Sequence, residues 1–225
     1  MARLSRLQIE RFFRYYHYLT RHFAALGERN AKVSSAELAA YLEVDPTLVR
    51  KDLAVLKIRG VPRVGYQAKK VVRAIERTLG FTREHRGVIV GAGRLGGAIA
   101  AYEGFKRYGF HFVALFDIDP RKVGTVLEGR PVLHMDKLPE YVARHDISFG
   151  VITVPIPAAQ EAADQLVRAG LKAIWNFAHV ALKVPSDVFV RNEHISIGLA
   201  ELAYYLRREK RRTRARSRKP LHKEG

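Results

Sequence analysis

Apolar and polar positions follow different patterns in the two parts of this chain. Over residues 1–80 the apolar side chains recur three and four residues apart, which is typical of amphipathic helices. From Gly87 onward they form short apolar runs that alternate with helical segments. The pattern therefore predicts a mainly helical first part and an α/β second part.

Helical periodicity in the first part predicts two longer helices. Apolar and aromatic positions over 4–26 predict the first of them, and Gly27 is a suitable C-terminal cap. Residues 68–79 predict another amphipathic helix. Two shorter helical patterns and a stretch that contains glycine and proline lie between them.

The two shorter helices have clear N-terminal signals. Ser34 or Ser35 can cap the first, and Glu37 stands three residues after Ser34, as a capping box requires. Asp45 followed by Pro46 begins the second, PTLVRKDLAVLK. Two helices joined by a tight turn predict a helix-turn-helix.

The stretch IRGVPRVGY after these helices breaks the helical periodicity with two glycines and a proline. It predicts the β-hairpin wing of a winged-helix domain, a DNA-binding class. The candidate DNA-binding residues on the two helices and the wing are Ser35, Thr47, Arg50, Lys51, Lys57, Arg59, Arg63 and Tyr66.

Strands and helices alternate in the second part. Candidate strands lie at 87–90, 112–116, 149–154, 173–177 and 195–198, and candidate helices at 94–107, 138–144 and 158–169. Short apolar strands between helices predict a Rossmann-like, doubly wound parallel sheet that is covered on both faces. A last helix over 199–212 has leucines on one face and needs a packing partner, whereas 213–225 are expected to be disordered.

A glycine-rich turn in VIVGAGRLGGAIA matches the fingerprint of dinucleotide-binding domains. Gly91, Gly93 and Gly96 follow a predicted strand and open a predicted helix, whose N-terminus favours phosphate. Asp117 ends the next predicted strand, where a carboxylate accepts both ribose hydroxyls of NAD and repels the 2′-phosphate of NADP. A turn role is the alternative for Asp117, and Asp119 fits that role better.

The charge of the chain is concentrated at its ends. The formal net charge is +18. Residues 1–80 carry 16 basic and 7 acidic side chains and residues 207–225 carry 10 and 2, whereas residues 81–206 carry 14 and 13. A polyanion is the natural partner for basic ends, because bound phosphates release counterions. Simple solvation is the alternative for the tail.

Other features of the composition exclude several classes. The chain has no cysteine, so disulfides and thiolate metal sites are absent, and no metal site is predicted. No apolar run reaches the length of a membrane span, and the arginine-rich start lacks the apolar core of a signal peptide. We therefore expect a cytoplasmic protein.

A winged helix with VRKDL before a Rossmann-like domain with VGAGRLG, FDIDP, TVP and NFA resembles the Rex family of bacterial redox-sensing repressors. The resemblance covers residues 11–206. It implies a homodimer that binds palindromic operator DNA and releases it when NADH fills the Rossmann site. It also implies that the C-terminal helix swaps into the partner subunit, although such helices more often pack on their own subunit.

The same resemblance assigns residue roles. Arg50 matches a bidentate contact to guanine and Lys51 a phosphate contact. The positions that match the family's NADH and NAD⁺ site are Gly91, Gly93, Arg94, Leu95, Gly96, Tyr102, Asp117, Ile118, Thr153, Val154, Pro155, Asn176, Phe177 and Ala178. Core packing is the alternative for Tyr102 and Phe177.

Three departures from the family matter. Leu48 stands where glutamine is usual and the wing is less rich in glycine, so the operator is expected to shift. The family's sensing network joins the tyrosine at position 102 to an arginine and to the partner's aspartate, but His17 and His194 occupy those positions. His179 replaces the proline after NFA. Two histidines form no salt bridge, so either coupling uses other contacts or sensing is weak.

The expected domains are a winged helix over 1–82, an NAD(H)-binding domain over 83–198, a dimerisation helix over 199–212 and a basic tail over 213–225. Two other classes remain open. One is a repressor whose Rossmann domain only dimerises or binds another nucleotide, such as coenzyme A. The other is a small NAD-dependent oxidoreductase, which the lack of a substrate domain and of an acid/base pair such as Tyr-x-x-x-Lys disfavours.

Overall fold

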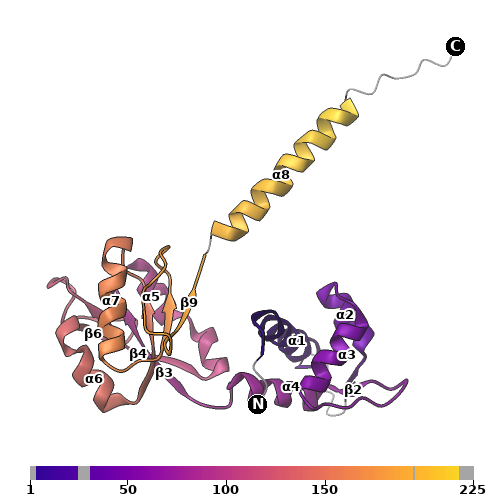
Figure 1. The fold of residues 1–225 in the computed structure, drawn as a ribbon, viewed down its shortest axis with the longest axis horizontal. Coiled ribbons are helices and arrows are strands. Elements are labelled where there is room, and N and C mark those ends of the chain that lie inside the picture. The colour runs from indigo at the N-terminus through magenta and orange to yellow at the C-terminus, as the bar shows by residue number, and fades with distance from the viewer. Residues whose placement is uncertain (1–3, 25–30, 195, 218–225) are drawn as a thin grey trace. The chain divides into compact units, whose positions relative to one another are not determined.

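The chain forms two compact units, drawn as a ribbon in Figure 1. The computed structural model describes residues 4–24, 31–194 and 196–217. The first unit takes the chain up to His85 together with Glu103–His111, and the second takes Arg86–Tyr102 and the chain from Phe112 onward. The domain limits expected from the sequence stay a prediction, and the structure adds that Glu103–His111 packs with the first unit.

The first unit is a winged helix. Its elements are α1 (Arg6–Ala24), β1 (Lys32–Val33), α2 (Ser35–Leu42), α3 (Pro46–Val55), β2 (Tyr66–Gln67) and α4 (Ala68–Leu79). Sequence periodicity had predicted all four helices, and the expected cap at Gly27 lies outside the described residues. Strands β1 and β2 pair antiparallel, with Val33 opposite Tyr66.

Local chemistry fixes where α2 and α3 begin. The Ser34 hydroxyl accepts the Glu37 N–H at 3.0 Å, and the Glu37 carboxylate accepts the Ser34 N–H at 2.6 Å. This reciprocal capping box satisfies two N–H groups that the helix leaves without partners. At α3 the Asp45 carboxylate accepts the Thr47 N–H at 2.6 Å, and Pro46 takes the first helical position.

One apolar core joins the helices of the first unit. Side chains from α1, α2, α3 and α4 are fully buried in it: Phe12, Tyr15, Leu19, Leu38, Val49, Leu53, Val71 and Ile75. The wing closes through an antiparallel bridge between Val61 and Gly65, and Gly65 has a φ of +90°. A Cβ on Gly65 would lie 2.5 Å from the Val33 carbonyl oxygen, so only glycine fits here.

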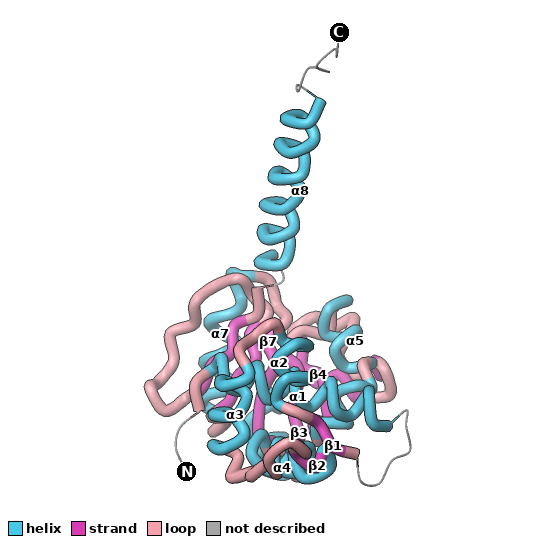
Figure 2. The backbone as a smooth tube through the Cα atoms, turned by 90° about the vertical axis from the view of Figure 1, so that its right-hand side faces the viewer, coloured by secondary structure: helices cyan, strands magenta, loops and turns pink. Residues whose placement is uncertain are grey.

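The second unit is built on a seven-stranded sheet in the order β5-β6-β4-β3-β7-β8-β9. Its strands are β3 (His85–Val90), β4 (Phe110–Asp117), β5 (Val126–Leu127), β6 (Arg130–His134), β7 (Ile147–Ile152), β8 (Ala173–Asn176) and β9 (Phe189–Asn192). The pairs β3–β7, β4–β6, β7–β8 and β8–β9 are parallel, and β5–β6 is antiparallel. Figure 2 shows β3, β4 and β7 among the magenta strands.

Helices cover the sheet of the second unit. They are α5 (Arg94–Ala101), α6 (Leu138–His145) and α7 (Ile156–Arg168). Two short 3₁₀ helices also occur: η2 (Met135–Lys137) precedes α6, and η1 (Glu103–Tyr108) packs with the first unit. Val88 and Val90 pack in the core that includes residues of α6 and α7, and Ile89 between them is also fully buried. Because alternate side chains point to opposite faces, both faces of β3 are covered, as the doubly wound prediction requires.

Three sequence-based expectations were wrong in detail, and one hairpin was missed. The strand expected at 195–198 is absent, because Ser196–Ser217 form α8, and β9 lies earlier, at Phe189–Asn192. The helix expected over 94–107 ends at Ala101 and gives way to η1. The hairpin of β5 and β6 was not foreseen. The C-terminal helix continues past 212 to Ser217, into the tail expected to be disordered, and 218–225 lie outside the described residues.

Within the described ranges, no helix has both the length and the apolar character that crossing a membrane requires.

Candidate nucleotide and DNA sites

The glycine-rich turn lies at the carboxyl end of β3, next to the carboxyl ends of β4 and β7. The strand order reverses its direction at β3, since β4 follows it in the chain on one side and β7 lies on the other. Open α/β sheets bind ligands in the crevice at this topological switch point. The structure therefore puts the predicted phosphate loop where the fold favours a nucleotide.

The three fingerprint glycines have different surroundings. Gly91 has a φ of +105°, and a Cβ there would lie 2.9 Å from the Thr153 carbonyl oxygen. A Cβ on Gly96 would overlap the Gly91 carbonyl oxygen, so Gly96 permits the close approach of α5 to the turn. Gly93 is the N-cap of α5, and a Cβ on Gly93 would have no other atom within 4 Å. Gly93 is thus the residue whose backbone stays open to a ligand.

The remaining residues of this loop open α5. Arg94 and Leu95 are exposed in the first turn, and no acidic residue stands there. The N–H groups and the positive end of the helix dipole at such an N-terminus are suited to bind a phosphate. Ala92 between the glycines is buried, and its N–H donates to Asp117 Oδ2 at 2.8 Å.

Asp117 is nearly buried at the end of β4, with 9% of its surface exposed. Oδ2 accepts from the Ala92 N–H and from Lys122 Nζ at 2.9 Å, and Oδ1 accepts the Asp119 N–H at 2.9 Å. Burial by itself raises the pKa of Asp117, but the hydrogen bonds from Asp119, Lys122 and Ala92 outweigh it and hold that pKa below its usual value. Asp117 therefore shapes the loop as an anion.

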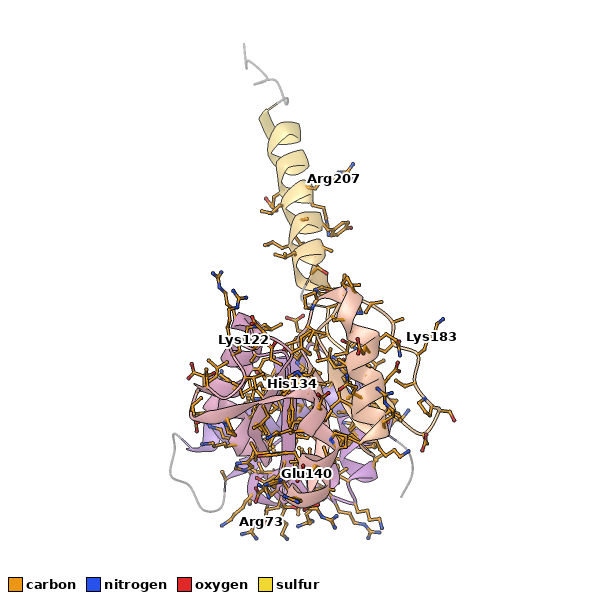
Figure 3. The ribbon with its side chains drawn as sticks, turned by 90° about the vertical axis from the view of Figure 1, so that its left-hand side faces the viewer. Arg73, Lys122, His134, Glu140, Lys183 and Arg207 are labelled. Atoms are coloured by element: carbon orange, nitrogen blue, oxygen red, sulfur yellow. The ribbon has the colours of Figure 1, made fainter. Side chains whose placement is uncertain are left out.

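Sequence reasoning missed Lys122, which Figure 3 labels. Its ammonium group lies 2.9 Å from Asp117 Oδ2 and 4.0 Å from Asp119 Oδ2. Asp119 is the turn former that the sequence indicated, because its carboxylate accepts the Arg121 N–H at 3.0 Å. The Arg121 guanidinium hydrogen-bonds the same carboxylate and lowers the pKa of Asp119 to about 2. Ile118 between the two aspartates is 71% exposed.

Thr153 ties the end of β7 to the glycine turn. Its hydroxyl lies 3.0 Å from the Val90 carbonyl oxygen and 2.9 Å from the Gly91 carbonyl oxygen, to which it donates. Its backbone N–H also donates to Val90. Val154 and Pro155 follow, and Pro155 is the N-cap of α7. Residues 153–155 therefore line the same edge of the sheet as the glycine turn.

Asn176, Phe177 and Ala178 follow at the end of β8. The Asn176 side chain is fully buried and donates to the Val180 carbonyl oxygen and to Asn192 Oδ1, while its own Oδ1 accepts the Ala178 N–H at 3.0 Å. This amide shapes the turn after β8. The Phe177 ring packs against Trp175 at 4.6 Å, in keeping with the packing role weighed for it.

Tyr102, the tyrosine expected near the nicotinamide, is the C-cap of α5 and is 61% exposed. The His17 Nε2 lies 2.8 Å from the Tyr108 hydroxyl, and the His194 ring stacks at 6.0 Å from that of His179.

In the first unit, three of the candidate DNA-binding residues come together. The Arg50 guanidinium, on the exposed side of α3, donates to the Thr47 hydroxyl at 3.0 Å and to the Ser35 hydroxyl at 3.4 Å. Lys51 is exposed beside it. The recognition helix thus presents two cations, and Arg50 is held over its own first turn.

The side of α3 away from Arg50 and Lys51 carries a network that sequence reasoning missed. Asp52 is 1% exposed, and its carboxylate accepts from Arg11 Nε at 2.6 Å, Arg11 Nη2 at 2.7 Å and the Tyr15 hydroxyl at 3.0 Å. The hydrogen bond to Asp52 raises the pKa of Arg11, and burial raises the pKa of Tyr15. This bidentate pair fixes the recognition helix on α1.

The remaining DNA-binding candidates follow α3 into the wing. Lys57 and Arg63 have φ values of 57° and 61°, a left-handed backbone that marks the two bends of this segment. Lys57, Arg59 and Arg63 are exposed, and Tyr66 is half-buried with its ring over Gly60. The wing therefore adds three cations to those of α3.

The fold and these sites define a class of protein: a winged-helix DNA-binding unit joined to a Rossmann-like nucleotide-binding unit. Two family models agree, since residues 3–54 match "Putative DNA-binding protein N-terminus" and residues 82–180 match "CoA binding domain".

Relatives and solved structures narrow that class. The redox-sensing transcriptional repressor Rex of Treponema denticola is 41% identical and aligns over 79% of this chain and 85% of its own length. Rex of Thermoanaerobacter pseudethanolicus is 36% identical over 92% of each chain. The Rex-family repressor RSP, solved with β-NAD⁺ and operator DNA, is 33% identical with a TM-score of 0.85, and covers 98% of this chain and 100% of its own. RSP with β-NADH gives a TM-score of 0.84 at the same identity, covering 96% of this chain and 100% of that one.

This chain belongs to the Rex family of redox-sensing transcriptional repressors. The family consists of repressors, so the oxidoreductase alternative is set aside.

Proposed function

We propose that this protein is a homodimeric repressor that binds operator DNA through α3 and the wing and releases it when NADH binds at the glycine-rich turn. The observation that carries this proposal is the meeting, in one chain, of an exposed recognition helix and a phosphate loop whose Gly93 is open to a ligand. RSP, which aligns over nearly the whole chain, is recorded with operator DNA and with both nucleotides. Because the proposed partner of this chain is genomic DNA, we propose that the protein acts in the cytoplasm.

The residues of the second unit fit a dinucleotide. Gly93 and the N-terminus of α5 would hold the pyrophosphate, with Arg94 and Leu95 beside it. Asp117 and Ile118 would lie at the adenosine side. The segments 153–155 and 176–178, at the ends of β7 and β8, would lie towards the nicotinamide, with Tyr102.

A nucleotide can act as a signal only through unequal affinity. NADH must bind the arrangement that does not hold DNA better than the one that does, since equal affinity shifts no population. NADH and NAD⁺ differ by a hydride and by the charge of the ring, so the discrimination has to occur at the nicotinamide. No bond of the nucleotide changes in this scheme.

On the DNA side, the two classes of contact have separate residues. We assign Arg50 to a bidentate contact with guanine, and Lys51 and the wing cations Lys57, Arg59 and Arg63 to phosphates. Ser35 and Thr47 hold the Arg50 guanidinium in the free protein, and we infer that they contact the DNA backbone beside it. Tyr66 supports the wing.

A homodimer would cover the apolar side of α8. Its exposed side chains include Leu199, Leu202 and Leu206, with Tyr204 and Tyr205 next to them. Exposed leucines three and four residues apart indicate a helix that packs on another chain. A two-fold dimer also presents two recognition helices to a palindromic operator.

Fluorescence anisotropy tests this function directly. A duplex selected from a random pool by the nucleotide-free protein serves as the operator, and its Kd is measured at a fixed total of NADH and NAD⁺ with a varied ratio. We expect the Kd to rise at least about tenfold as NADH replaces NAD⁺. NADPH and coenzyme A are the control ligands. An operator Kd that millimolar NADH leaves unchanged would refute the sensing function, and a response to coenzyme A instead would identify the ligand as that nucleotide.

A further inference from the structure

The segment Glu103–His111 belongs to the first unit, although the residues before and after it in the sequence belong to the second. It lies between α5 and the body of β4, yet it packs with the DNA-binding unit. The Tyr108 ring packs against the rings of Phe13, Tyr16 and Phe81, at centroid distances of 5.2, 6.1 and 5.0 Å. The Tyr108 hydroxyl lies 2.8 Å from His17 Nε2. The segment is therefore attached to α1 by one aromatic cluster and one polar contact.

The end of this segment is also fixed by its backbone. Gly109 has a φ of +79°, and a Cβ there would overlap the Arg83 carbonyl oxygen. The His85 N–H donates to the Gly109 carbonyl oxygen at 2.7 Å, and the His85 ring stacks on Phe110 at 4.8 Å. The segment thus docks on the chain that leaves α4 as well as on α1.

The hydrogen bond between His17 and Tyr108 involves a neutral imidazole ring. Burial, together with the charges of Arg21 and Arg107, lowers the pKa of His17, so the imidazole is neutral at neutral pH. In a neutral imidazole one ring nitrogen donates and the other accepts, so the tautomer of His17 decides whether the Tyr108 hydroxyl donates to Nε2 or accepts from it. Protonation of His17 would leave Nε2 as a donor only.

Two opposite faces of helix α1 make different contacts. Arg11 and Tyr15, four residues apart, hold Asp52 of the recognition helix. Phe13 and His17, also four residues apart, lie on the other side of the helix and hold Tyr108. Because a packed helix moves as one body, a shift of Tyr108 would reach Asp52 through α1.

The start of the segment meets the nucleotide-binding unit through the chain itself. Tyr102, which we place at the nicotinamide side, immediately precedes Glu103, the first residue of η1. Any displacement of Tyr102 on binding NADH would therefore be passed along the backbone to η1.

We propose that Tyr108 and His17 are positioning residues that transmit the state of the nucleotide site from Tyr102, through η1 and α1, to Asp52 and the recognition helix. This proposal rests on the proposed function. It explains how a chain with histidine at position 17 can respond to NADH without an ion pair there. Asp52 would then have two roles: its carboxylate anchors α3 on α1, and it passes a shift of α1 on to the recognition helix.

A contiguous set of contacts is a hypothesis until coupling is measured. The quantity to measure is the coupling factor, which is the operator Kd with saturating NADH divided by the operator Kd without nucleotide, for the full-length protein. By thermodynamic linkage, operator changes the Kd for NADH by the same factor, so intrinsic NADH fluorescence gives an independent value.

The decisive variant is Tyr108→Phe, which removes the hydroxyl and keeps the ring. We expect its melting temperature to stay within a few degrees of the wild type. Its operator Kd without nucleotide and its NADH Kd without DNA should stay within about twofold. Its coupling factor should fall about fivefold or more, within the range of typical coupling energies. Tyr141→Phe, which removes a hydroxyl that donates to the Val113 carbonyl oxygen in the other unit, should leave the factor unchanged.

Substitutions at His17 separate transmission from packing. His17→Gln keeps a side chain that can donate or accept a hydrogen bond and should retain most of the coupling factor, whereas His17→Leu should lose it. The double variant His17→Leu/Tyr108→Phe should lose no more than either single variant, because both remove the same contact.

The outcomes discriminate between the two proposals. If the wild type binds no NADH or does not respond to it, the proposed function fails and this inference fails with it. If the wild type responds and folded Tyr108→Phe keeps the full coupling factor, only the transmission path is overturned. A Tyr108→Phe protein that loses NADH affinity or nucleotide-free operator affinity, with the coupling factor intact, would show a local structural role and would also overturn it.

Discussion

Among the residues that the structure describes, each unit has one buried carboxylate, and the two are held in different ways. Asp52 in the winged helix is bound by side chains only, from Arg11 and Tyr15 on another helix. Asp117 in the Rossmann-like unit is bound by two backbone N–H groups, those of Ala92 and Asp119, and by one lysine.

The difference follows from what each carboxylate has to fix. A bidentate pair between two helices sets the rotation and height of one helix on the other, which is what a recognition helix requires. Backbone hydrogen bonds set the path of a loop, which is what a phosphate site requires, because its ligand binds backbone N–H groups. The DNA unit is therefore preorganised by side chains and the nucleotide unit by its main chain.

The largest effect is expected from breaking the side-chain network. Asp52→Ala leaves the Arg11 guanidinium, whose side chain is only 18% exposed, without its partner. We expect the free energy of unfolding of the first unit to fall by about 3 kcal/mol. Urea denaturation followed by circular dichroism measures it.

The matched control for that change is Arg11→Met/Asp52→Leu, which replaces both charges by apolar groups. It should recover most of the lost stability, because no charge is left unpaired. A loss below about 1 kcal/mol in Asp52→Ala would mean that packing alone holds α3.

The next largest effect is expected at two glycines of the phosphate loop, whose substitution tests how the main chain shapes the second unit. Gly96→Ala brings a Cβ against the Gly91 carbonyl oxygen and should destabilise the second unit by about 2 kcal/mol. Gly93→Ala meets open space and should leave stability within about 0.5 kcal/mol. It should nevertheless weaken NADH binding about tenfold or more, measured by titration calorimetry. Equal stability losses in the two variants would contradict the assignment of Gly93 to the ligand side.

A smaller effect distinguishes the carboxylates by acid titration. The pKa of Asp117 is lowered, so its contribution is fully present above its unfolded value of about 3.9 and is lost as pH falls through the folded value. Lys122, at 39% side-chain exposure, is partly screened, and we expect at most about 1 kcal/mol. Asp117→Asn should flatten the stability of the second unit below pH 4. An unchanged acid limb in this variant would assign that loss to other carboxylates.

The smallest effect concerns His17. Its pKa is lowered by burial and by Arg21 and Arg107, so the folded first unit binds this proton less well than the unfolded chain does. Its stability contribution is therefore complete above the unfolded pKa of about 6.5 and declines as pH falls below it towards the folded value. Thermal melts between pH 5 and 8 should show this slope in the wild type and not in His17→Gln. The same slope in both proteins would exclude His17 as its source.

Much of each unit followed from local sequence. The capping box at Ser34 and the Asp45–Pro46 start are read from residues a few positions apart, and both helices begin where those residues predict. The glycine fingerprint likewise gave the turn after β3. The expected strand at 195–198 failed because a short apolar run suits a strand and a helix equally well, and its length did not decide between them.

The partners of the polar side chains could not be predicted in this way. Asp117 was expected to face a ribose, but it also binds Lys122 and Ala92. Asn176 matched a nucleotide segment, yet its amide is used within the turn after β8.

The sequence by itself determined the two folds, the recognition helix and the phosphate loop, because each depends on periodicity, capping and glycine within a short stretch. Only the tertiary structure decided that Arg11 meets Asp52 and that Tyr108 meets His17. These partners lie 41 and 91 residues apart in the chain. A hydrogen bond depends on distances of about 3 Å between atoms in space, and spacing along the chain does not contain those distances.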